Sequence, residues 1–273
     1  MKIVIPMSGY GNRFVQAGYK EPKPILSFNG RRMIEYVLDM FSPSDSFVFI
    51  CNKKHLLETD MKEILVSLVP DCKIIETDPH KFGPVYTVKQ AYEYIEDDEE
   101  VIISYTDFTQ RWNYEKFKEK VSKDNLDGCI ISHIGFHPHS LNNTKMAFMR
   151  EDNGVVLEIK EKECYTDNHM NEHGSTGIYY FKYGHYIKTY FDLCIERDIN
   201  YNGEYYVTLV YNLLIKDGLK VGCYPVPKVA ILGTPDELEN FKSWKNILTS
   251  GQVKSESDLL KCYHYWKEYH GSL

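Results

Sequence analysis

The sequence predicts an α/β fold in which helices flank a mixed central sheet. Three observations support this prediction: strand-like and helix-like segments alternate from residue 2 to residue 105, a glycine-rich turn follows the first strand, and the second half contains strand-like segments in a less regular order. The chain has 273 residues, of which 43% are hydrophobic and 26% are charged. It is therefore long enough to bury a sizeable core, and its composition is neither that of a disordered chain nor that of a collagen.

Seven segments of the first half alternate between the two kinds of element. Four are short apolar runs that we expect to form strands, and three repeat apolar residues at helical intervals. The strands are residues 2–6, 46–51, 72–76 and 101–105, and the helices are residues 32–41, 54–69 and 85–95. This β-α-β-α-β order predicts parallel strands with the functional site at their carboxyl ends.

The second half predicts a more mixed sheet with two further helices. The expected strands are residues 128–133, 146–150, 155–160, 175–181 and 220–226, and the expected helices are residues 183–196 and 205–216. Because no Pro- or Ser-rich linker interrupts the chain, the simplest division is one α/β domain over residues 1–242 and a C-terminal helical appendage over residues 243–273. The aromatic residues of the appendage favour packing against something, so a dimerisation arm in a homo-oligomer and a lid both remain open. These residues are Tyr263, Tyr265, Trp266 and Tyr269.

Charge and cysteine usage exclude several classes of protein. Lys and Arg number 32 against 39 Asp and Glu, a formal charge of -7 that argues against a general nucleic-acid-binding protein. The seven cysteines are scattered without a CxxC pair, as in a cytosolic protein with reduced thiols. No apolar run approaches the length of a membrane span, and the first residues lack a signal peptide's apolar stretch. We expect a soluble cytoplasmic enzyme that does not insert into membranes.

The strongest functional signal is the segment at residues 8–25, SGYGNRFVQAGYKEPKPI, which follows the first expected strand. Gly9 and Gly11 permit a tight turn, so that successive backbone N–H groups can surround phosphate oxygens. Arg13 and Lys23 would add two positive charges to the same loop. A triphosphate requires this combination of amide donors and cations. The segment therefore predicts a nucleotide-binding loop that begins at Ser8.

Other phosphate-binding loops fit this segment less well. A dinucleotide-binding fingerprint requires a third glycine where Phe14 stands and an acidic residue where Asn52 ends the second strand. A Walker loop requires Gly-Lys followed by Ser or Thr, which the segment lacks. A surface hairpin with incidental glycines is the remaining alternative, and the nearby Arg and Pro-Lys-Pro residues argue against it.

The pattern S-G-x-G-x-R-F followed by P-K-P-I-L resembles the signature loop of the sugar-phosphate nucleotidyltransferase family, whose members make nucleotide-sugars. Further motifs that are similar to those of the family follow in order up to residue 235. They are Gly83-Pro84-Val85, Tyr105-Thr106-Asp107, Ile159-Lys160-Glu161-Lys162, Gly174-Ser175-Thr176-Gly177-Ile178-Tyr179, Asn202-Gly203-Glu204-Tyr205 and Leu232-Gly233-Thr234-Pro235. The resemblance implies a Rossmann-like, GT-A-like nucleotidyltransferase fold. Its NTP-binding half would end near residue 125, and its acceptor-binding half would span residues 126–242.

The resemblance also implies roles for individual residues. Arg13 would steady the β- and γ-phosphates, Lys23 would bridge the α-phosphate and the pyrophosphate, and Lys162 would hold the incoming phosphate. Asp107 would bind Mg²⁺, a hard cation that prefers oxygen ligands. The residue implied to contact the base is Gly83, and the residues implied to contact the acceptor are Glu161, Gly177 and Glu204.

Two of these residues have a plain structural alternative, and one motif departs from the family pattern. Lys162 lies in the charged run KEKE and is alternatively a solvated surface residue, and Asp107 is alternatively a turn residue. Family members often place a second metal-binding Asp just before the late Gly-Thr, where this chain has Ile231 and Leu232. Either one carboxylate suffices, or another residue such as Glu204 or Asp236 contributes.

The base specificity depends on the stretch IETDPHKFGP at residues 75–84, where uridylyl- and thymidylyltransferases commonly have a Gln before the Gly turn. Here Glu76 or Asp78 occupies this neighbourhood. A carboxylate only accepts hydrogen bonds, which suits the exocyclic amino group of cytosine or guanine. The stretch therefore favours CTP or GTP as the donor, with Asp78 as a nucleotide-binding residue.

Five histidines gather in the acceptor half, and metal binding is one interpretation of them. They are His133, His137, His139, His169 and His173. Their spacing is not that of a regular zinc site, and Pro138 interrupts a helix there. The other interpretation is that His137 and His139 line the acceptor pocket.

The expected reaction needs no general base, because a phosphate monoester is already mostly dianionic at neutral pH, with a second pKa of about 6. The site must supply alignment and neutralisation of charge. We expect transfer of NMP from an NTP to a sugar-1-phosphate, with release of pyrophosphate, for surface polysaccharide synthesis. The alternatives are a CTP-dependent enzyme acting on an alditol phosphate or a phosphocholine-like acceptor, a GT-A glycosyltransferase, and an inactive nucleotide-binding paralogue.

Overall fold

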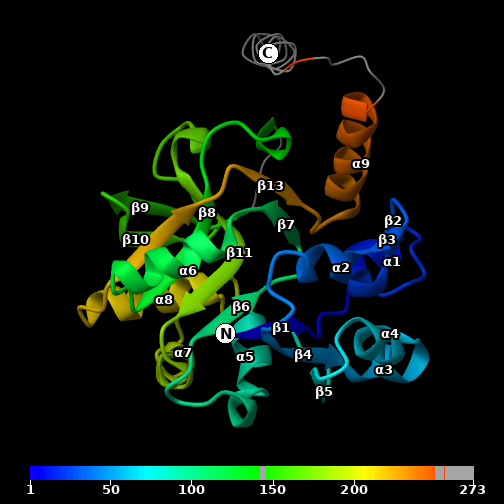
Figure 1. The fold of residues 1–273 in the computed structure, drawn as a ribbon, viewed down its shortest axis with the longest axis horizontal. Coiled ribbons are helices and arrows are strands. Elements are labelled where there is room, and N and C mark those ends of the chain that lie inside the picture. Colours follow the sequence, from blue (N-terminus) through cyan, green and yellow to red (C-terminus); the bar gives the residue numbers. More distant parts are fainter. Residues whose placement is uncertain (142–145, 250–254, 256–273) are drawn as a thin grey trace.

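A nine-stranded mixed sheet forms the centre of the protein in a computed structural model that describes residues 1–141, 146–249 and 255 (Figure 1). In spatial order the strands are β5 (Lys73–Thr77), β4 (Ser46–Asn52), β1 (Lys2–Met7), β6 (Val101–Ser104), β11 (His173–Phe181), β8 (Gly128–His133), β12 (Val221–Pro225), β10 (Val155–Lys160) and β9 (Phe148–Asp152). All nine coincide with segments expected from the sequence, to within a few residues. The prediction of an α/β fold with a mixed central sheet is confirmed.

The sheet changes direction at β11. Strands β5, β4, β1 and β6 are mutually parallel, and Val4 of β1 lies between Val48 of β4 and Ile103 of β6. Strand β11 runs antiparallel to both β6 and β8, so it joins the parallel half to the rest of the sheet. The carboxyl ends of the four parallel strands consequently meet at one edge, where α/β proteins bind their ligands.

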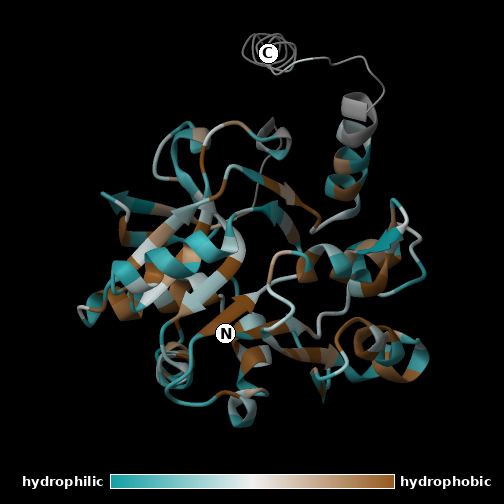
Figure 2. Cartoon of the chain, in the orientation of Figure 1, coloured by the Kyte–Doolittle hydropathy of each residue, from teal (hydrophilic) through white to brown (hydrophobic). Residues whose placement is uncertain are grey.

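Helices cover both faces of the sheet. They are α1 (Asn12–Gln16), α2 (Met33–Leu38), α3 (Lys53–Glu58), α4 (Met61–Leu68), α5 (Pro84–Lys89), α6 (Tyr114–Lys123), α7 (Gly184–Glu196), α8 (Val207–Lys216) and α9 (Pro235–Thr249). Strand β1 is buried on both sides: Val4 belongs to one hydrophobic core, and Ile3 and Ile5 belong to the other. Figure 2 shows the hydrophobic residues of the central strands in brown.

Two expected helices are shorter than the sequence predicts. The segment at residues 54–69 forms two helices, α3 and α4, because the chain is extended at Thr59. The Thr59 hydroxyl donates to the carbonyl of His55 (2.6 Å) and accepts from the N–H of Met61 (3.3 Å), so it ends one helix and starts the next. The segment at residues 85–95 is α-helical only to Lys89 and continues as a 3₁₀ turn at Tyr92–Tyr94.

A small second sheet, which the sequence did not predict, closes over the edge where the parallel strands end. It consists of β7 (Phe108–Arg111) and β13 (Lys228–Ile231), which pair antiparallel with Phe108 opposite Ile231. A short hairpin of β2 (Ser27–Phe28) and β3 (Arg31–Arg32) and the helix α6 were also not predicted. The pairing of β7 with β13 brings the chain after Asp107 beside the chain before Gly233.

The C-terminal helix begins earlier than the expected appendage. Helix α9 starts at Pro235 and crosses the expected boundary between residues 242 and 243 (Figure 1). The aromatic residues expected at 263–269 lie outside the described residues. In the described part of the chain, no helix is long and apolar enough to cross a membrane. The six cysteines described there are all free thiols.

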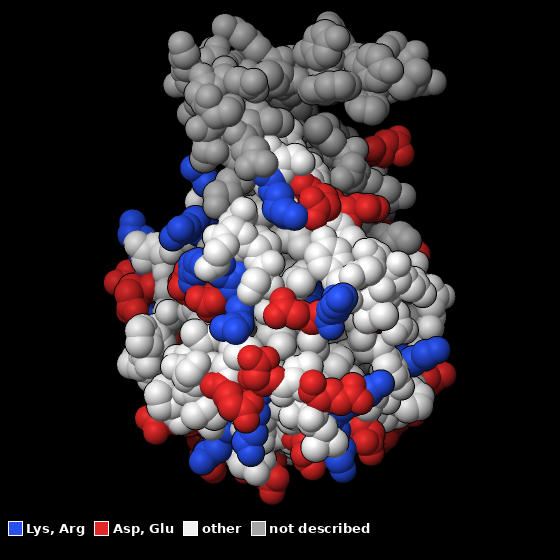
Figure 3. Space-filling view, turned by 90° about the vertical axis from the view of Figure 1, so that its right-hand side faces the viewer, with Lys and Arg blue, Asp and Glu red and all other residues white. Residues whose placement is uncertain are grey.

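Charged side chains of both signs are interspersed on the face shown in Figure 3. The described part of the chain also contains exposed ion pairs, such as Lys188 with Asp97 (2.6 Å) and Arg31 with Asp39 (2.6 Å). Exposed pairs of this kind contribute little to stability. The described part of this face has no broad patch of a single sign.

A cluster of three buried histidines occupies the end of β8 and the loop after it. The rings of His133, His137 and His139 lie 4.7 to 5.4 Å apart between centroids, and the Nε2 atoms of His133 and His139 are 3.2 Å apart. Burial and the neighbouring imidazoles lower the pKa of His133 to about 3 and that of His139 to about 2. The cluster is therefore neutral at physiological pH. Within residues 1–141 and 146–249, no group of three His, Cys, Asp or Glu side chains is arranged to hold a metal ion.

The start of α7 gives a test of packing. A Cβ atom added at Gly184 would lie 2.0 Å from the carbonyl oxygen of Glu96, a backbone atom that cannot move away easily. We expect Gly184→Ala to destabilise the protein by about 2 kcal/mol and to lower its Tm by about 5 °C in thermal unfolding followed by circular dichroism. Gly9→Ala is the control, because a Cβ there would meet no atom within 4 Å. Equal melting temperatures for the two variants would contradict this packing.

The histidine cluster predicts a loss of stability in mild acid. An unfolded histidine has a pKa of about 6.5, so below that pH the unfolded chain binds protons that the folded cluster does not. The free energy of unfolding should therefore fall as the pH falls from 6.5 toward 4, by up to about 1.4 kcal/mol per pH unit for each histidine. Urea unfolding of His139→Gln should show a shallower dependence on pH than the native protein. An identical dependence would contradict the prediction.

Candidate active site

The nucleotide-binding segment forms a loop between β1 and α1, at the carboxyl edge of the parallel strands. Gly11 has a φ of +66° and precedes the helix, which is a conformation that glycine adopts without strain. Gly9, Gly11 and Arg13 line a cavity of about 420 Å³. Ser8 is buried behind the loop, where its Oγ lies 2.9 Å from Oγ1 of Thr87. The loop thus exposes backbone and a guanidinium group to the cavity, as the sequence predicts.

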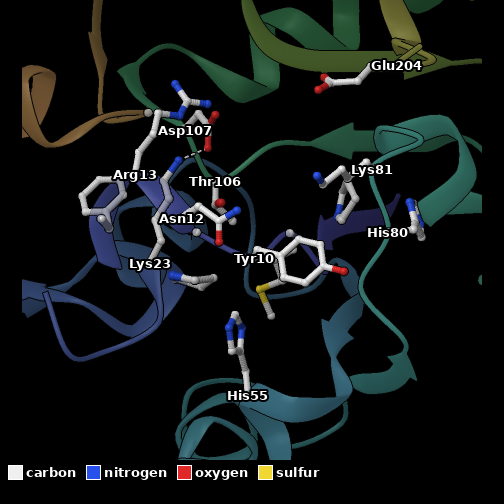
Figure 4. Close-up of a pocket in the computed structure, with 17 residues that line it drawn as sticks. Tyr10, Asn12, Arg13, Lys23, His55, His80, Lys81, Thr106, Asp107 and Glu204 are labelled. Atoms are coloured by element: carbon white, nitrogen blue, oxygen red, sulfur yellow. Dashed lines mark hydrogen bonds and ion pairs between the residues drawn. The ribbon is translucent and has the colours of Figure 1, made fainter. Parts of the chain in front are cut away.

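Lys23 and Asp107 meet in this cavity. Lys23 lies between Pro22 and Pro24 and is the first residue of a 3₁₀ turn. Asp107 follows the end of β6. The Lys23 ammonium forms an ion pair with Oδ1 of Asp107, and the Lys23 side chain is only 12% exposed. Figure 4 shows Arg13, Lys23 and Asp107 together on one side of the cavity and His80 and Lys81 across from them. Three of the four residues implied for phosphate and metal binding are therefore in one place.

A second cavity of about 780 Å³ adjoins the first and contains two further predicted residues, Glu161 and Lys162. Arg13, Asp107 and Gly233 line both cavities. The second cavity is also lined by Glu161 and Lys162, and by aromatic residues, which are Tyr105, Phe108, Tyr179 and Tyr206. Lys162 is therefore a cavity residue and not merely a solvated surface lysine.

Glu161 is a buried carboxyl group in the wall of this second cavity. It is 7% exposed, and its Oε2 accepts a hydrogen bond from the hydroxyl of Thr208. Burial raises the pKa of Glu161 to about 7, while the hydroxyl and Lys162 partly oppose the shift. The group is poised to lose or gain a proton near neutral pH, and it can either accept or donate a hydrogen bond to a bound molecule.

Two glycines of the predicted set are required by close approach of other residues. Gly83 has a φ of +86°, and an added Cβ would lie 2.9 Å from both the N and the O atoms of Tyr205. Gly177 has a φ of +74°, and an added Cβ would lie 2.6 Å from the ring of Phe108. Gly83 lines a third cavity of about 310 Å³, together with Ser8. Gly177 lies beneath Phe108 and supports the wall of the second cavity.

Asp78 does not reach the cavities. Its side chain is exposed, and His80 and Lys81 line the first and third cavities instead. The Nδ1 atom of His80 accepts from the N–H of Phe82 (3.2 Å), and its Nε2 lies 3.3 Å from Oγ1 of Thr87. Burial lowers the pKa of His80, so its ring is neutral at pH 7. The side chains of this stretch that face the cavities therefore begin two residues after Asp78, because the folded turn decides which side chains point inward.

Glu204 lines the first and third cavities, on the nucleotide side, and not the larger second cavity in which the acceptor was expected. Its carboxylate accepts a hydrogen bond from the hydroxyl of Tyr206. His137 and His139 line none of these three cavities and belong to the buried cluster described above.

A carboxylate that the sequence did not single out lies close to Asp107. The N–H of Leu232 donates to the backbone carbonyl of Asp107 (2.6 Å), so the end of β13 runs beside it. A Cβ added at Gly233 would lie 3.0 Å from Oε2 of Glu237 and 3.4 Å from Oδ2 of Asp107. This Oε2 atom is buried and has no hydrogen-bond partner. Asp236 lines the second cavity, but it is Glu237 that approaches Asp107. In the sequence, the only signal that pointed to Glu237 was its place in the acidic residues after the late Gly-Thr-Pro motif.

Comparison with known proteins agrees with this geometry. The MobA-like NTP transferase domain matches residues 3–146, just over half of the chain. The bifunctional protein GlmU of Clostridioides difficile (strain 630) is 24% identical over 229 residues, which cover 82% of this chain and 46% of GlmU. The GlmU of Clostridium novyi (strain NT) is 23% identical over 262 residues, which cover 94% of this chain and 52% of GlmU. The chain therefore spans about half the length of the curated relatives it matches.

Solved structures show the same fold. The nucleoside-diphosphate-sugar pyrophosphorylase from Vibrio cholerae RC9 superposes with a TM-score of 0.71 and 22% identity, covering 88% of this chain and 98% of that one. The inositol-1-phosphate CTP transferase from T. maritima superposes with a TM-score of 0.68 and 16% identity, covering 93% and 97%. Taken with the loop, the cations and the carboxylates at the edge of the sheet, these matches identify the chain as a nucleotidyltransferase that belongs to the MobA-like NTP transferase domain family.

Proposed function

We propose that the enzyme transfers NMP from an NTP to a sugar-1-phosphate and releases pyrophosphate, which produces an NDP-sugar for surface polysaccharide synthesis. The observation that supports this proposal best is that Arg13 and Asp107 line both the nucleotide-side cavity and the larger cavity beside it. A donor and an acceptor bound in the two cavities would meet at these residues. The larger cavity, at about 780 Å³, has room for a small phosphorylated molecule.

The proposed reaction is an in-line displacement at the α-phosphorus of the NTP. An oxygen of the acceptor phosphate forms a new bond to the α-phosphorus. The bond that breaks joins the α-phosphorus to the oxygen that bridges to the β-phosphorus, and its electron pair leaves with pyrophosphate. Arg13 would neutralise the leaving group, Lys23 would stabilise charge at the α-phosphate, and Lys162 would hold the acceptor phosphate. Alignment and neutralisation of charge are the main requirements of such a reaction.

Mg²⁺ is the cofactor we propose, with Asp107 and Glu237 as its protein ligands. Both groups provide carboxylate oxygens, which Mg²⁺ prefers, and the remaining ligands of such a site usually come from phosphates and water. The unpartnered Oε2 atom of Glu237 fits this role, because a buried carboxylate oxygen without a donor is costly. When bound, the ion would neutralise negative charge on the phosphates.

A second candidate function is supported by the chemistry of the larger cavity. It combines tyrosine and phenylalanine rings with the carboxyl groups of Glu161, Asp236 and Glu237. Aromatic rings and carboxylates bind quaternary ammonium groups. The alternative acceptor is therefore a phosphocholine-like molecule or an alditol phosphate, with CTP as the donor.

For the donor base we propose CTP or GTP. The sequence-based argument used a carboxylate that accepts a hydrogen bond from an exocyclic amino group, and Asp78 is too exposed to provide it. Glu204 is the carboxylate that lines the third cavity beside Ser8 and Gly83, so we assign this role to Glu204. We further propose that the enzyme works in the cytoplasm, that residues 1–242 form its catalytic domain, and that it binds no nucleic acid.

Nucleotide binding can be tested without knowledge of the acceptor. With Mg²⁺ present, CTP or GTP should raise the Tm more than UTP, dTTP or ATP, because a ligand that binds only the folded state stabilises it. Release of pyrophosphate is then measured with glucose-1-phosphate and with phosphocholine as separate acceptors. An unchanged Tm with all five nucleotides would contradict the proposal.

Lys23→Ala and Asp107→Ala should each lower kcat by about 100-fold or more while the Tm changes little, because each removes a charge at the centre of the transferred group. The matched controls are Lys188→Ala and Asp97→Ala, which break another lysine–aspartate pair on the surface (2.6 Å). The controls should retain full pyrophosphate release. Full activity of Lys23→Ala or Asp107→Ala would refute the assigned roles.

Glu237→Gln should weaken metal binding about tenfold, as measured by the electron paramagnetic resonance of Mn²⁺ added in place of Mg²⁺. Glu239→Gln provides the control on the same helix, since Glu239 is exposed and pairs with Lys242 (2.7 Å). If Glu237→Gln and Glu239→Gln bind Mn²⁺ equally well, Glu237 is not a ligand.

A further inference from the structure

We infer that Tyr206 is a positioning residue that holds the Lys162 ammonium in the second, larger cavity, called the acceptor cavity below. We also infer that Glu204 fixes the direction of the Tyr206 hydroxyl. The inference deepens the proposed function and rests on it, because Lys162 is the residue proposed to hold the acceptor phosphate. Tyr206 acts through Lys162 and has no chemical step of its own.

A tight turn places Tyr201, Glu204 and Tyr206 near one another. Asn202 and Gly203 both have left-handed backbones, with φ values of +53° and +79°, as the two central residues of a type I′ turn require. The N–H of Tyr201 donates to the carbonyl of Glu204 (2.9 Å), and the N–H of Glu204 donates back to the carbonyl of Tyr201 (3.1 Å). The turn therefore places the Tyr201 and Glu204 side chains next to each other, with Tyr206 two residues further on.

Lys162 lies between the two tyrosines. Its ammonium donates a hydrogen bond to the Tyr206 hydroxyl and lies 4.3 Å from the centre of the Tyr206 ring and 5.1 Å from that of Tyr201. Both ring distances are within the range in which a cation is attracted to an aromatic face. The Lys162 backbone is also constrained, with a φ of +59° and an N–H that donates to the carbonyl of Met146 (3.1 Å). The lysine is thus held at its backbone by Met146 and at its ammonium group by the two tyrosines.

The Glu204 carboxylate orients the hydroxyl of Tyr206. A phenol has one O–H, and here it donates to Oε2 of Glu204, which leaves the oxygen lone pairs available to Lys162. Burial, together with this hydrogen bond, raises the pKa of Tyr206 well above its usual value, so the phenol is protonated at neutral pH. The order of donation from Lys162 to Tyr206 to Glu204 is therefore fixed throughout the working pH range.

The consequence concerns binding of the acceptor phosphate. An ammonium has three N–H donors, and Tyr206 occupies one, which leaves two for phosphate oxygens. Tyr206 lines both the acceptor cavity and the third cavity, so the lysine is held near the place where the cavities adjoin. Without the hydroxyl, the lysine would lose its one directional bond and regain rotamer freedom, and the acceptor would have to order it again on binding.

Tyr206→Phe tests this inference because it keeps the ring and removes the hydroxyl. With glucose-1-phosphate or phosphocholine, whichever releases pyrophosphate, we expect KM for the acceptor to rise about tenfold and KM for the NTP to rise much less. In a Lys162→Ala background, Tyr206→Phe should add no further loss of kcat/KM for the acceptor. A full additional loss in that background, or an equal rise of both KM values, would overturn the inference.

The matched control is Tyr92→Phe. Tyr92 also donates its hydroxyl to a carboxylate, Asp192 (3.1 Å), and its ring also lies near a lysine, with Lys89 Nζ 5.7 Å from the centroid. It lines none of the three cavities of the site. The same chemical change at Tyr92 should leave both KM values unaltered, so an effect at Tyr206 alone cannot be a general cost of losing a tyrosine hydroxyl.

A second measurement is independent of the acceptor. Lysines labelled by reductive ¹³C-methylation give one NMR signal per side chain, and Lys162→Arg identifies the signal of Lys162. This signal should move toward that of exposed lysines in Tyr206→Leu, change less in Tyr206→Phe, and stay in place in Tyr92→Phe. An unmoved Lys162 signal in Tyr206→Leu would overturn the inference. A moved signal in a protein that transfers NMP to neither acceptor would uphold the contact while refuting the proposed function.

Discussion

The position of β11 between β6 and β8 is the constraint on which the site depends. Ile178 of β11 pairs with Ser104 of β6, and the N–H of Tyr105 donates to the carbonyl of Gly177 (2.9 Å). Asp107 follows this paired segment directly, so its position is set by the sheet and not by a free loop. Since β11 also pairs with β8 on its other side, this second ladder fixes β8 and the strands beyond it relative to Asp107. Two cavities can share Asp107 only because one continuous sheet connects their walls.

Two lysines of the site have partners in the free protein. Lys23 forms an ion pair with Asp107. Lys162 donates a hydrogen bond to the Tyr206 hydroxyl and lies near two aromatic rings. Uncompensated charges in a partly buried site would be costly, so each of these cations needs a partner in the free enzyme. A triphosphate can replace such partners with stronger charge-assisted hydrogen bonds. Pairing of this kind keeps the lysines ordered while leaving them available to phosphates.

Several features of the site were predictable because they depend on local chemistry. A glycine-rich turn after a buried strand, a lysine between two prolines and an aspartate at the end of another strand are all visible in the sequence. The strand pattern was predictable for a similar reason, since apolar runs buried on both faces are distinctive. The break at Thr59 was less visible, because a threonine can either sit within a helix or cap the next one, depending on its hydroxyl.

Local patterns in the sequence were enough for the fold class, and they placed a glycine-rich loop, Arg13, Lys23 and Asp107 at one edge of a sheet, because alternating strands and helices bring strand ends together there. The tertiary structure alone decided which side chains complete the site. His80 and Lys81 line the cavity while Asp78 stays exposed, because the path of the turn decides which side chains point inward. Glu237 approaches Asp107 because β13 pairs with β7, which places Ala230 opposite Thr109, 121 residues earlier in the chain. Such contacts between distant segments follow from packing of the whole chain, which no local pattern encodes.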